Sequence, residues 1–283
     1  MRAFVFALAL VACTRREPAP PPDASLVVVV ASVVPEAAPP PVLTGAGQVE
    51  LRDGDASAIS LGVVAVPVGT RTPRPIMIAL HGGSDHPEWA CSAWSGIVSS
   101  YAFVVCPRGV GATAALAWSS PADTKARVER AVAATTAAYG AWVRPTTTTV
   151  LVGFSMGATQ TAMLAQMDPK RYRRVSLAES AYAPEPALAF ARPWASGGGE
   201  RALFLCTTDG CEGTYRDVAR NVASQHVPAR LNIAGTHAHG MWDAVVQSMR
   251  RDWPWLVEGA EGWEDYIAPA GAPPGRSESF EVR

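Results

Sequence analysis

The chain contains 283 residues, 48% hydrophobic and 17% charged, which suffices to bury one large core and excludes a chain that is disordered throughout. The formal net charge of −1 at pH 7, without a dense cluster of Lys and Arg, argues against a nucleic-acid partner. Beyond the N-terminus, no apolar run reaches the roughly 18 residues that a membrane-spanning helix needs.

The N-terminus has the pattern of a bacterial export signal. Met1 and Arg2 give a basic start, and an apolar run then ends in a small residue before Cys13. The segment Leu10–Cys13 resembles the lipobox of bacterial lipoproteins, which implies that residues 1–12 are removed as a signal peptide and that Cys13 receives lipid. A non-lipidated export signal or an unprocessed N-terminal strand is the alternative. We therefore expect a protein of the bacterial periplasm or cell envelope, anchored to the membrane through Cys13.

Composition divides the rest of the chain into three parts. Residues 13–48 contain a proline-rich stretch, which favours extended and solvated chain, so we predict a tether there. Strand and helix patterns alternate over residues 49–270 and predict one folded domain. Residues 271–283 are rich in Gly, Pro and Ser, and we expect a flexible tail.

The alternation within the domain predicts an α/β fold, in which helices cover both faces of a mostly parallel, doubly wound sheet. Short apolar runs that are typical of buried strands occupy 60–66, 75–80, 102–106, 149–152, 174–178, 202–206 and 229–233. Helical patterns occupy 121–142, 158–165, 215–225 and 241–251.

One motif lies between a predicted strand and a predicted helix. Gly153–Gly157 reads G-x-S-x-G, the sequence of a sharp strand-to-helix turn that holds a serine hydroxyl out for attack. The two glycines are needed because such a turn leaves no room for side chains beside the serine. This context indicates that Ser155 is a nucleophile.

A catalytic serine needs a histidine as base and an acid that orients the histidine. The run His81–Gly83 follows one strand, Gly153–Gly157 another, Asp209 a third, and a loop with two histidines the last. On these motifs the span 75–255 resembles the α/β-hydrolase family, of the esterase and dienelactone-hydrolase-like kind. The resemblance implies an α/β-hydrolase fold, a triad in the order Ser, acid, His, and no metal or cofactor.

The resemblance assigns roles to particular residues. Ser155 is the nucleophile, and Asp209 is expected to orient the base. His239 is favoured as the base because His239–Trp242 fits the family pattern best, with His237 as the alternative. Other carboxylates remain candidates for the acid: Glu212, Asp217 and Glu179.

The oxyanion of acyl transfer requires preorganised N–H donors. We expect one from the backbone of Met156, at a helix start, and a second from Gly83 or Ser84. Three further residues are predicted to line the substrate site: His81, which is also expected to hold its loop, Trp89 and Trp118.

These assignments predict a secreted serine hydrolase that cleaves small-molecule carboxylic esters through an acyl-enzyme intermediate. Two alternatives remain open: a peptidase or amidase with the same triad, and a lipid-anchored binding protein on a hydrolase scaffold without catalytic activity. The sequence fixes neither the substrate nor the oligomeric state.

The cysteine count fits an oxidising compartment. Five cysteines leave four after Cys13, and these form two pairs in one of three connectivities. The simplest is local: Cys91 with Cys106, and Cys206 with Cys211.

Overall fold

The computed structural model describes residues 40–54, 59–112, 115–180, 189–235, 238–271 and 274–281. The predicted signal peptide, Cys13 and the tether up to residue 39 lie outside these residues. Within the described residues, no helix combines the length and the apolar character that crossing a membrane requires.

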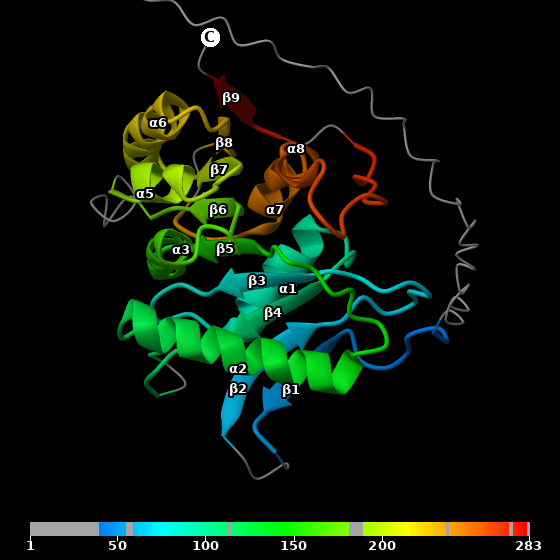
Figure 1. Ribbon diagram of the computed structural model, residues 1–283. Helices are drawn as coiled ribbons and strands as arrows, with labels where there is room; N and C mark the ends of the chain where they lie inside the picture. Colours follow the sequence, from blue (N-terminus) through cyan, green and yellow to red (C-terminus); the bar gives the residue numbers. More distant parts are fainter. Residues whose placement is uncertain are drawn as a thin grey trace, which may run out of the picture. The chain divides into compact units, whose positions relative to one another are not determined.

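A nine-stranded sheet forms the centre of the domain (Figure 1). The strands are β1 (Gln48–Arg52), β2 (Ser60–Ala65), β3 (Ile76–Leu80), β4 (Phe103–Pro107), β5 (Val150–Phe154), β6 (Arg174–Ala178), β7 (Arg201–Cys206), β8 (Ala229–Ile233) and β9 (Arg276–Phe280). Their spatial order is β1-β2-β4-β3-β5-β6-β7-β8-β9. The six strands from β4 to β8 are parallel, whereas β1, β2 and β9 pair antiparallel with their neighbours.

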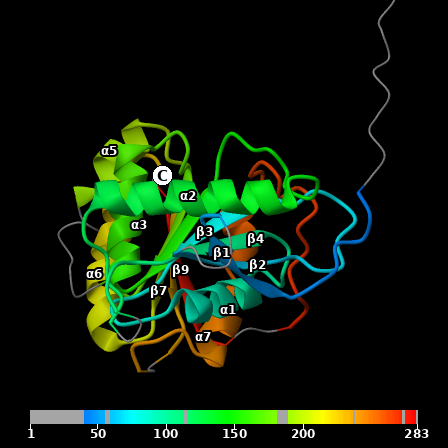
Figure 2. The same cartoon turned by 90° about the horizontal axis from the view of Figure 1, so that it is seen from below.

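Helices cover both faces of this sheet, as the alternation in sequence predicts. One face packs against α2 (Pro121–Tyr139), α3 (Met156–Met167), α5 (Ala191–Ser196) and α6 (Asp209–Ser224). The other packs against α1 (Pro87–Ile97), α7 (Asp243–Met249) and α8 (Trp253–Val257). Figure 2 shows α2 and α1 on opposite sides of the strands. The predicted doubly wound α/β class is confirmed.

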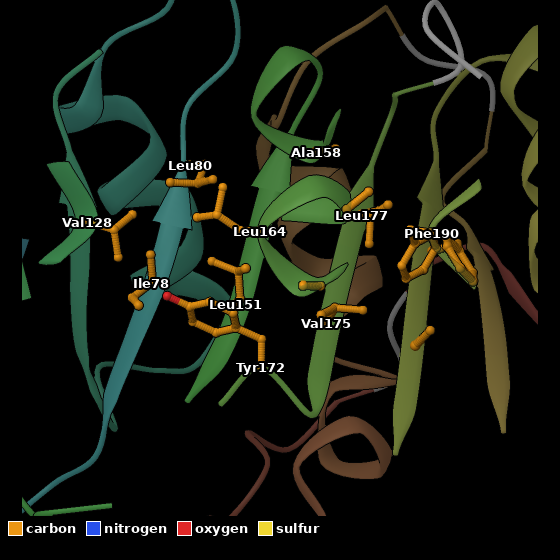
Figure 3. Close-up of a cluster of buried hydrophobic side chains, with 14 of the residues drawn as sticks. Ile78, Leu80, Val128, Leu151, Ala158, Leu164, Tyr172, Val175, Leu177 and Phe190 are labelled. Carbon is orange, nitrogen blue, oxygen red and sulfur yellow. The ribbon is translucent and has the colours of Figure 1, made fainter. Parts of the chain in front are cut away.

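Each central strand is buried on both faces because successive side chains point in opposite directions. In β3, Ile78 and Leu80 belong to the core under α2 and α3, whereas Met77 and Ala79 belong to the core under α1. Figure 3 shows the first of these cores, where Leu164 from α3 lies against the strand side chains. This explains the continuous apolar runs in the sequence.

The folded domain extends beyond both of its predicted boundaries, residues 49 and 270. Residues 40–48 do not all belong to the tether: Leu43 is buried, and its N–H donates to the carbonyl oxygen of Thr70. The predicted flexible tail contains β9, which pairs with β8 from Ala229↔Phe280 to Ile233↔Arg276. Edge strands tolerate polar side chains, so the sequence of β9 carries no apolar signal.

The local cysteine pairing is confirmed. Cys91 in α1 is bonded to Cys106 in β4, and Cys206 at the end of β7 is bonded to Cys211 in the first turn of α6. The second disulfide closes a loop at the edge of the sheet where Ser155 lies.

Candidate active site

Ser155 occupies a strained turn between β5 and α3. Its backbone has φ 54° and ψ −120°, a conformation that side-chain-bearing residues rarely adopt. The turn is held by the N–H of Ser155, which donates to the carbonyl oxygen of Ala178 on the neighbouring strand β6. The hydroxyl therefore stands at the carboxyl ends of the parallel strands, where open α/β sheets bind ligands.

The glycines of the motif are required by close packing. A methyl group on Gly157 would overlap the carbonyl oxygens of Leu80 and His81. A methyl group on Gly153 would lie 2.5 Å from Oγ1 of Thr161 and would overlap the carbonyl oxygen of Gly157. Both positions thus let α3 start directly against the ends of β3 and β5.

His239 is hydrogen-bonded to the nucleophile and to a carboxylate. Its Nε2 lies 2.9 Å from Oγ of Ser155, and its Nδ1 lies 3.0 Å from Oε2 of Glu179. A carboxylate only accepts hydrogen bonds, so the proton of a neutral ring belongs on Nδ1, and Nε2 accepts from the serine hydroxyl. The ring of His239 also lies against that of Phe154, with centroids 4.7 Å apart. These contacts fix the ring in the orientation that a base for Ser155 needs.

Glu179 follows β6 and is almost completely buried, with 1% of its side chain exposed. Backbone N–H groups of Thr207 and Thr208 both donate to Oε1, and the hydroxyl of Thr208 donates to Oε2. Burial alone would raise the pKa of Glu179, but the hydrogen bonds from His239 and Thr207 outweigh it, so the pKa lies below its ordinary value. The carboxylate is therefore ionised and can stabilise a protonated His239.

The expectation that Asp209 orients the base was wrong, since Glu179 is the acceptor at Nδ1 of His239. Asp209 is the first residue of α6, which begins six residues before the predicted 215. The loop after β7 contributes donors instead: Thr207 and Thr208 present their N–H groups to Glu179. The carboxylate beside His239 thus follows β6, the strand next to β5, and not β7 as expected.

The loop after β3 contains one of the two N–H groups proposed for an oxyanion. Gly82 N–H donates to Oδ2 of Asp85, and Ser84 N–H donates to the carbonyl oxygen of Leu116. Ser84 is thereby excluded as the donor, because its N–H is already used. The N–H of Gly83 has no acceptor among the described residues. The N–H of Met156, at the first position of α3, has no acceptor within its own helix.

His81 and Trp118 support the loop and do not line the substrate site. His81 is fully buried, its Nδ1 lies 2.7 Å from the carbonyl oxygen of Gly82, and its Nε2 accepts from the N–H of Gly109. Burial lowers the pKa of His81 and keeps the ring neutral. Trp118, 7% exposed, donates from Nε1 to the carbonyl oxygen of His81. Both predicted substrate contacts are corrected on the ground of burial: His81 has no exposed surface, and Trp118 is 7% exposed with its Nε1 already bonded.

Trp89 differs from Trp118 in its surroundings. It lies in the first turn of α1, is 63% exposed, and contacts the ring of His86 with centroids 4.4 Å apart. A role for Trp89 in substrate binding stays a prediction. His237, the alternative base, lies outside the described residues.

No protein-family model and no curated protein matches this chain. Solved structures are similar. Fluorophosphonate-binding serine hydrolase F of Staphylococcus aureus has a TM-score of 0.52 at 12% identity over 75% of this chain and 98% of its own. Est1E of Butyrivibrio proteoclasticus, solved with ferulic acid bound, has a TM-score of 0.51 at 11% identity over 74% of this chain and 99% of its own.

An uncharacterized protein of Bacillus cereus has a TM-score of 0.54 at 10% identity over 68% of this chain. The match spans 62% of the length of that protein. Together with the strand order, these likenesses establish that the chain has the α/β-hydrolase fold.

Proposed function

We propose that this protein is a serine hydrolase that cleaves carboxylic esters of small molecules through an acyl-enzyme intermediate. The observation that carries the proposal is the chain of hydrogen bonds from Ser155 Oγ through His239 to Glu179, with distances of 2.9 and 3.0 Å. Two structural neighbours support it: a serine hydrolase that binds fluorophosphonate, and Est1E, which was solved with ferulic acid bound. The hydrogen-bonded serine, histidine and carboxylate are the groups that ester cleavage through an acyl-enzyme requires.

The proposed reaction begins when Nε2 of His239 takes the proton of Ser155 Oγ, which attacks the ester carbonyl carbon. The carbonyl oxygen becomes an oxyanion, and the N–H groups of Met156 and Gly83 stabilise it. Protonated His239 gives its proton to the leaving alcohol, and the acyl group stays on Ser155. Water, deprotonated by His239, then releases the acid and restores the serine. Glu179 stabilises the imidazolium in both steps.

The test is hydrolysis of a short-chain p-nitrophenyl ester by the wild type and by Ser155→Ala. The proposal predicts a burst of p-nitrophenol when deacylation is slow and a covalent acyl adduct on Ser155 in rapidly quenched samples. Ser155→Ala should show neither, with unchanged far-UV circular dichroism. Ester hydrolysis that survives in Ser155→Ala, or preferential cleavage of matched amides, would refute it.

The export signal supports a second proposal, which concerns location. We propose that lipid on Cys13 anchors the hydrolase to the bacterial cell envelope, with the proline-rich segment as tether. Metabolic labelling with a palmitate analogue tests it. The wild type should carry the label and partition into the detergent phase, and Cys13→Ala should do neither. Equal labelling of both proteins would exclude Cys13 as the lipid site.

A further inference from the structure

The side chain of Met156 packs beside Gly83. A methyl group placed on Gly83 would lie 3.1 Å from Cε and 3.7 Å from Sδ of Met156. The thioether therefore fills the space into which a side chain at position 83 would point. The backbones of Gly83 and Met156 carry the two N–H groups that are proposed to bind the oxyanion, so the sulfur belongs to one donor residue and packs at the other.

The sulfur-bearing side chain is also accessible. Met156 is 40% exposed, whereas Met77 and Met249 are fully buried in the core. One other methionine of the described residues is comparably exposed: Met167, at 49%, which is the last residue of α3. The two exposed methionines thus occupy opposite ends of one helix, and only Met156 adjoins Ser155.

We propose that Met156 is a modification site, where oxidation to the sulfoxide by a peroxide reversibly inactivates the hydrolase. The inference rests on the proposed function. A lone pair of Sδ attacks one oxygen of the peroxide, the O–O bond breaks, and the sulfur keeps that oxygen. The sulfur loses two electrons, and hydrogen peroxide is reduced to water. A methionine sulfoxide reductase supplies two electrons and two protons, which restores the thioether and releases the oxygen as water.

The added oxygen acts through its position. A sulfoxide oxygen is a strong hydrogen-bond acceptor, and it forms on the side chain that packs at Gly83 and belongs to Met156, the two residues whose N–H groups are proposed to bind the ester carbonyl oxygen. It competes with the substrate for these donors and replaces an apolar surface with a polar one. We therefore expect kcat to fall more than KM rises, since the donors act mainly on the transition state.

The experiment treats the wild type, Met156→Leu and Met167→Leu with graded hydrogen peroxide. For each protein, the activity that remains after treatment is expressed as a fraction of the activity of the same protein before treatment. Peptide mass spectrometry measures how far each methionine is oxidised, and the two quantities are compared. We expect the wild type and Met167→Leu to lose at least tenfold in activity in proportion to oxygen added at Met156. Met156→Leu, which keeps the volume but lacks an oxidisable sulfur, should retain its starting activity. Methionine sulfoxide reductases A and B together should restore the wild type.

Loss of activity in Met156→Leu in parallel with the wild type would overturn the inference. Full activity in wild type that is oxidised at Met156, or oxidation of Met167 while Met156 stays reduced, would also overturn it. Failure of the proposed function looks different, because untreated wild type would then neither hydrolyse the ester nor react with a fluorophosphonate.

Discussion

Replacing Glu179 by Gln should damage catalysis by changing which nitrogen of His239 carries the proton. In the wild type, Oε1 accepts from the N–H groups of Thr207 and Thr208, and Oε2 faces Nδ1 of His239. A glutamine must keep its carbonyl oxygen at the Oε1 position, because its NH₂ group cannot face two N–H donors. The NH₂ group then faces Nδ1.

The consequence for His239 follows directly. Nδ1 must become an acceptor, so the proton moves to Nε2, which can no longer accept the proton of Ser155. The same change of tautomer lowers kcat by about 10⁴-fold in the serine protease that serves as the general example of a triad. We expect a loss of about 10³ to 10⁴-fold here, or roughly 4 to 5 kcal/mol of transition-state stabilisation.

The matched control is Asp209→Asn. Asp209 starts α6, so loss of its charge should cost about 0.3–1 kcal/mol of helix stabilisation and leave kcat within about threefold of the wild type. Both variants are assayed on one p-nitrophenyl ester, with circular dichroism and thermal unfolding to establish that they fold. The reasoning is refuted if Glu179→Gln keeps kcat within about tenfold, or if Asp209→Asn loses more than about a hundredfold.

Three further predictions concern stability. Ser155→Gly should raise the unfolding free energy by about 1 kcal/mol, measured by urea denaturation, because glycine adopts φ 54° without strain; a decrease would contradict this. Replacing both cysteines of the Cys206–Cys211 disulfide should cost about 2 kcal/mol, and removing Cys91–Cys106 about 3 kcal/mol because its loop is longer. Only removal of the Cys206–Cys211 disulfide should lower kcat, because the loop that it closes carries the N–H groups that donate to Glu179. Equal effects of the two disulfide removals on kcat would contradict this. The lowered pKa of Glu179 stabilises the fold above the unfolded-state pKa, and this contribution is lost as pH falls through the folded-state pKa. The stability advantage of wild type over Glu179→Gln should therefore shrink as pH falls below about 5, and an advantage that persists undiminished on acidification would contradict the assignment.

The strained turn at Ser155 could be predicted from sequence because its signals are local. Gly153 and Gly157 bracket Ser155 within one strand-turn-helix unit, and the turn is specified by close packing of that unit. His239 was favoured over His237 for a similar reason, the residues that directly follow it. In the structure, Nε2 of His239 is hydrogen-bonded to Oγ of Ser155.

The acid was mispredicted because its position depends on contacts between strands. Glu179 and Asp209 both follow apolar strands, so neither pattern nor spacing separates them. Two features of the fold decide between Glu179 and Asp209. Helix α6 already begins at Asp209, and the N–H groups of Thr207 and Thr208 donate to Glu179. The positive φ of Glu179, 56°, turns its side chain under the loop after β7, and no local sequence signal specifies that turn.

The misassigned loop residues have a related cause. His81 was expected near the substrate because it follows β3, but Gly109 and Trp118, distant in sequence, use its ring and its carbonyl oxygen. Likewise, Ser84 was a reasonable donor until the segment at Leu116 proved to accept its N–H. In each case the decisive partner comes from another part of the chain.

Reaction with a fluorophosphonate probe tests the central claim most directly, because the probe reports an activated serine whatever the natural ester. Labelled protein is digested, and the modified peptide is identified by mass spectrometry. The Ser155, His239 and Glu179 assignment predicts one label per chain, on Ser155, lost in Ser155→Ala and strongly slowed in Glu179→Gln. A folded wild type that takes no label, or takes it on another residue, would contradict the assignment.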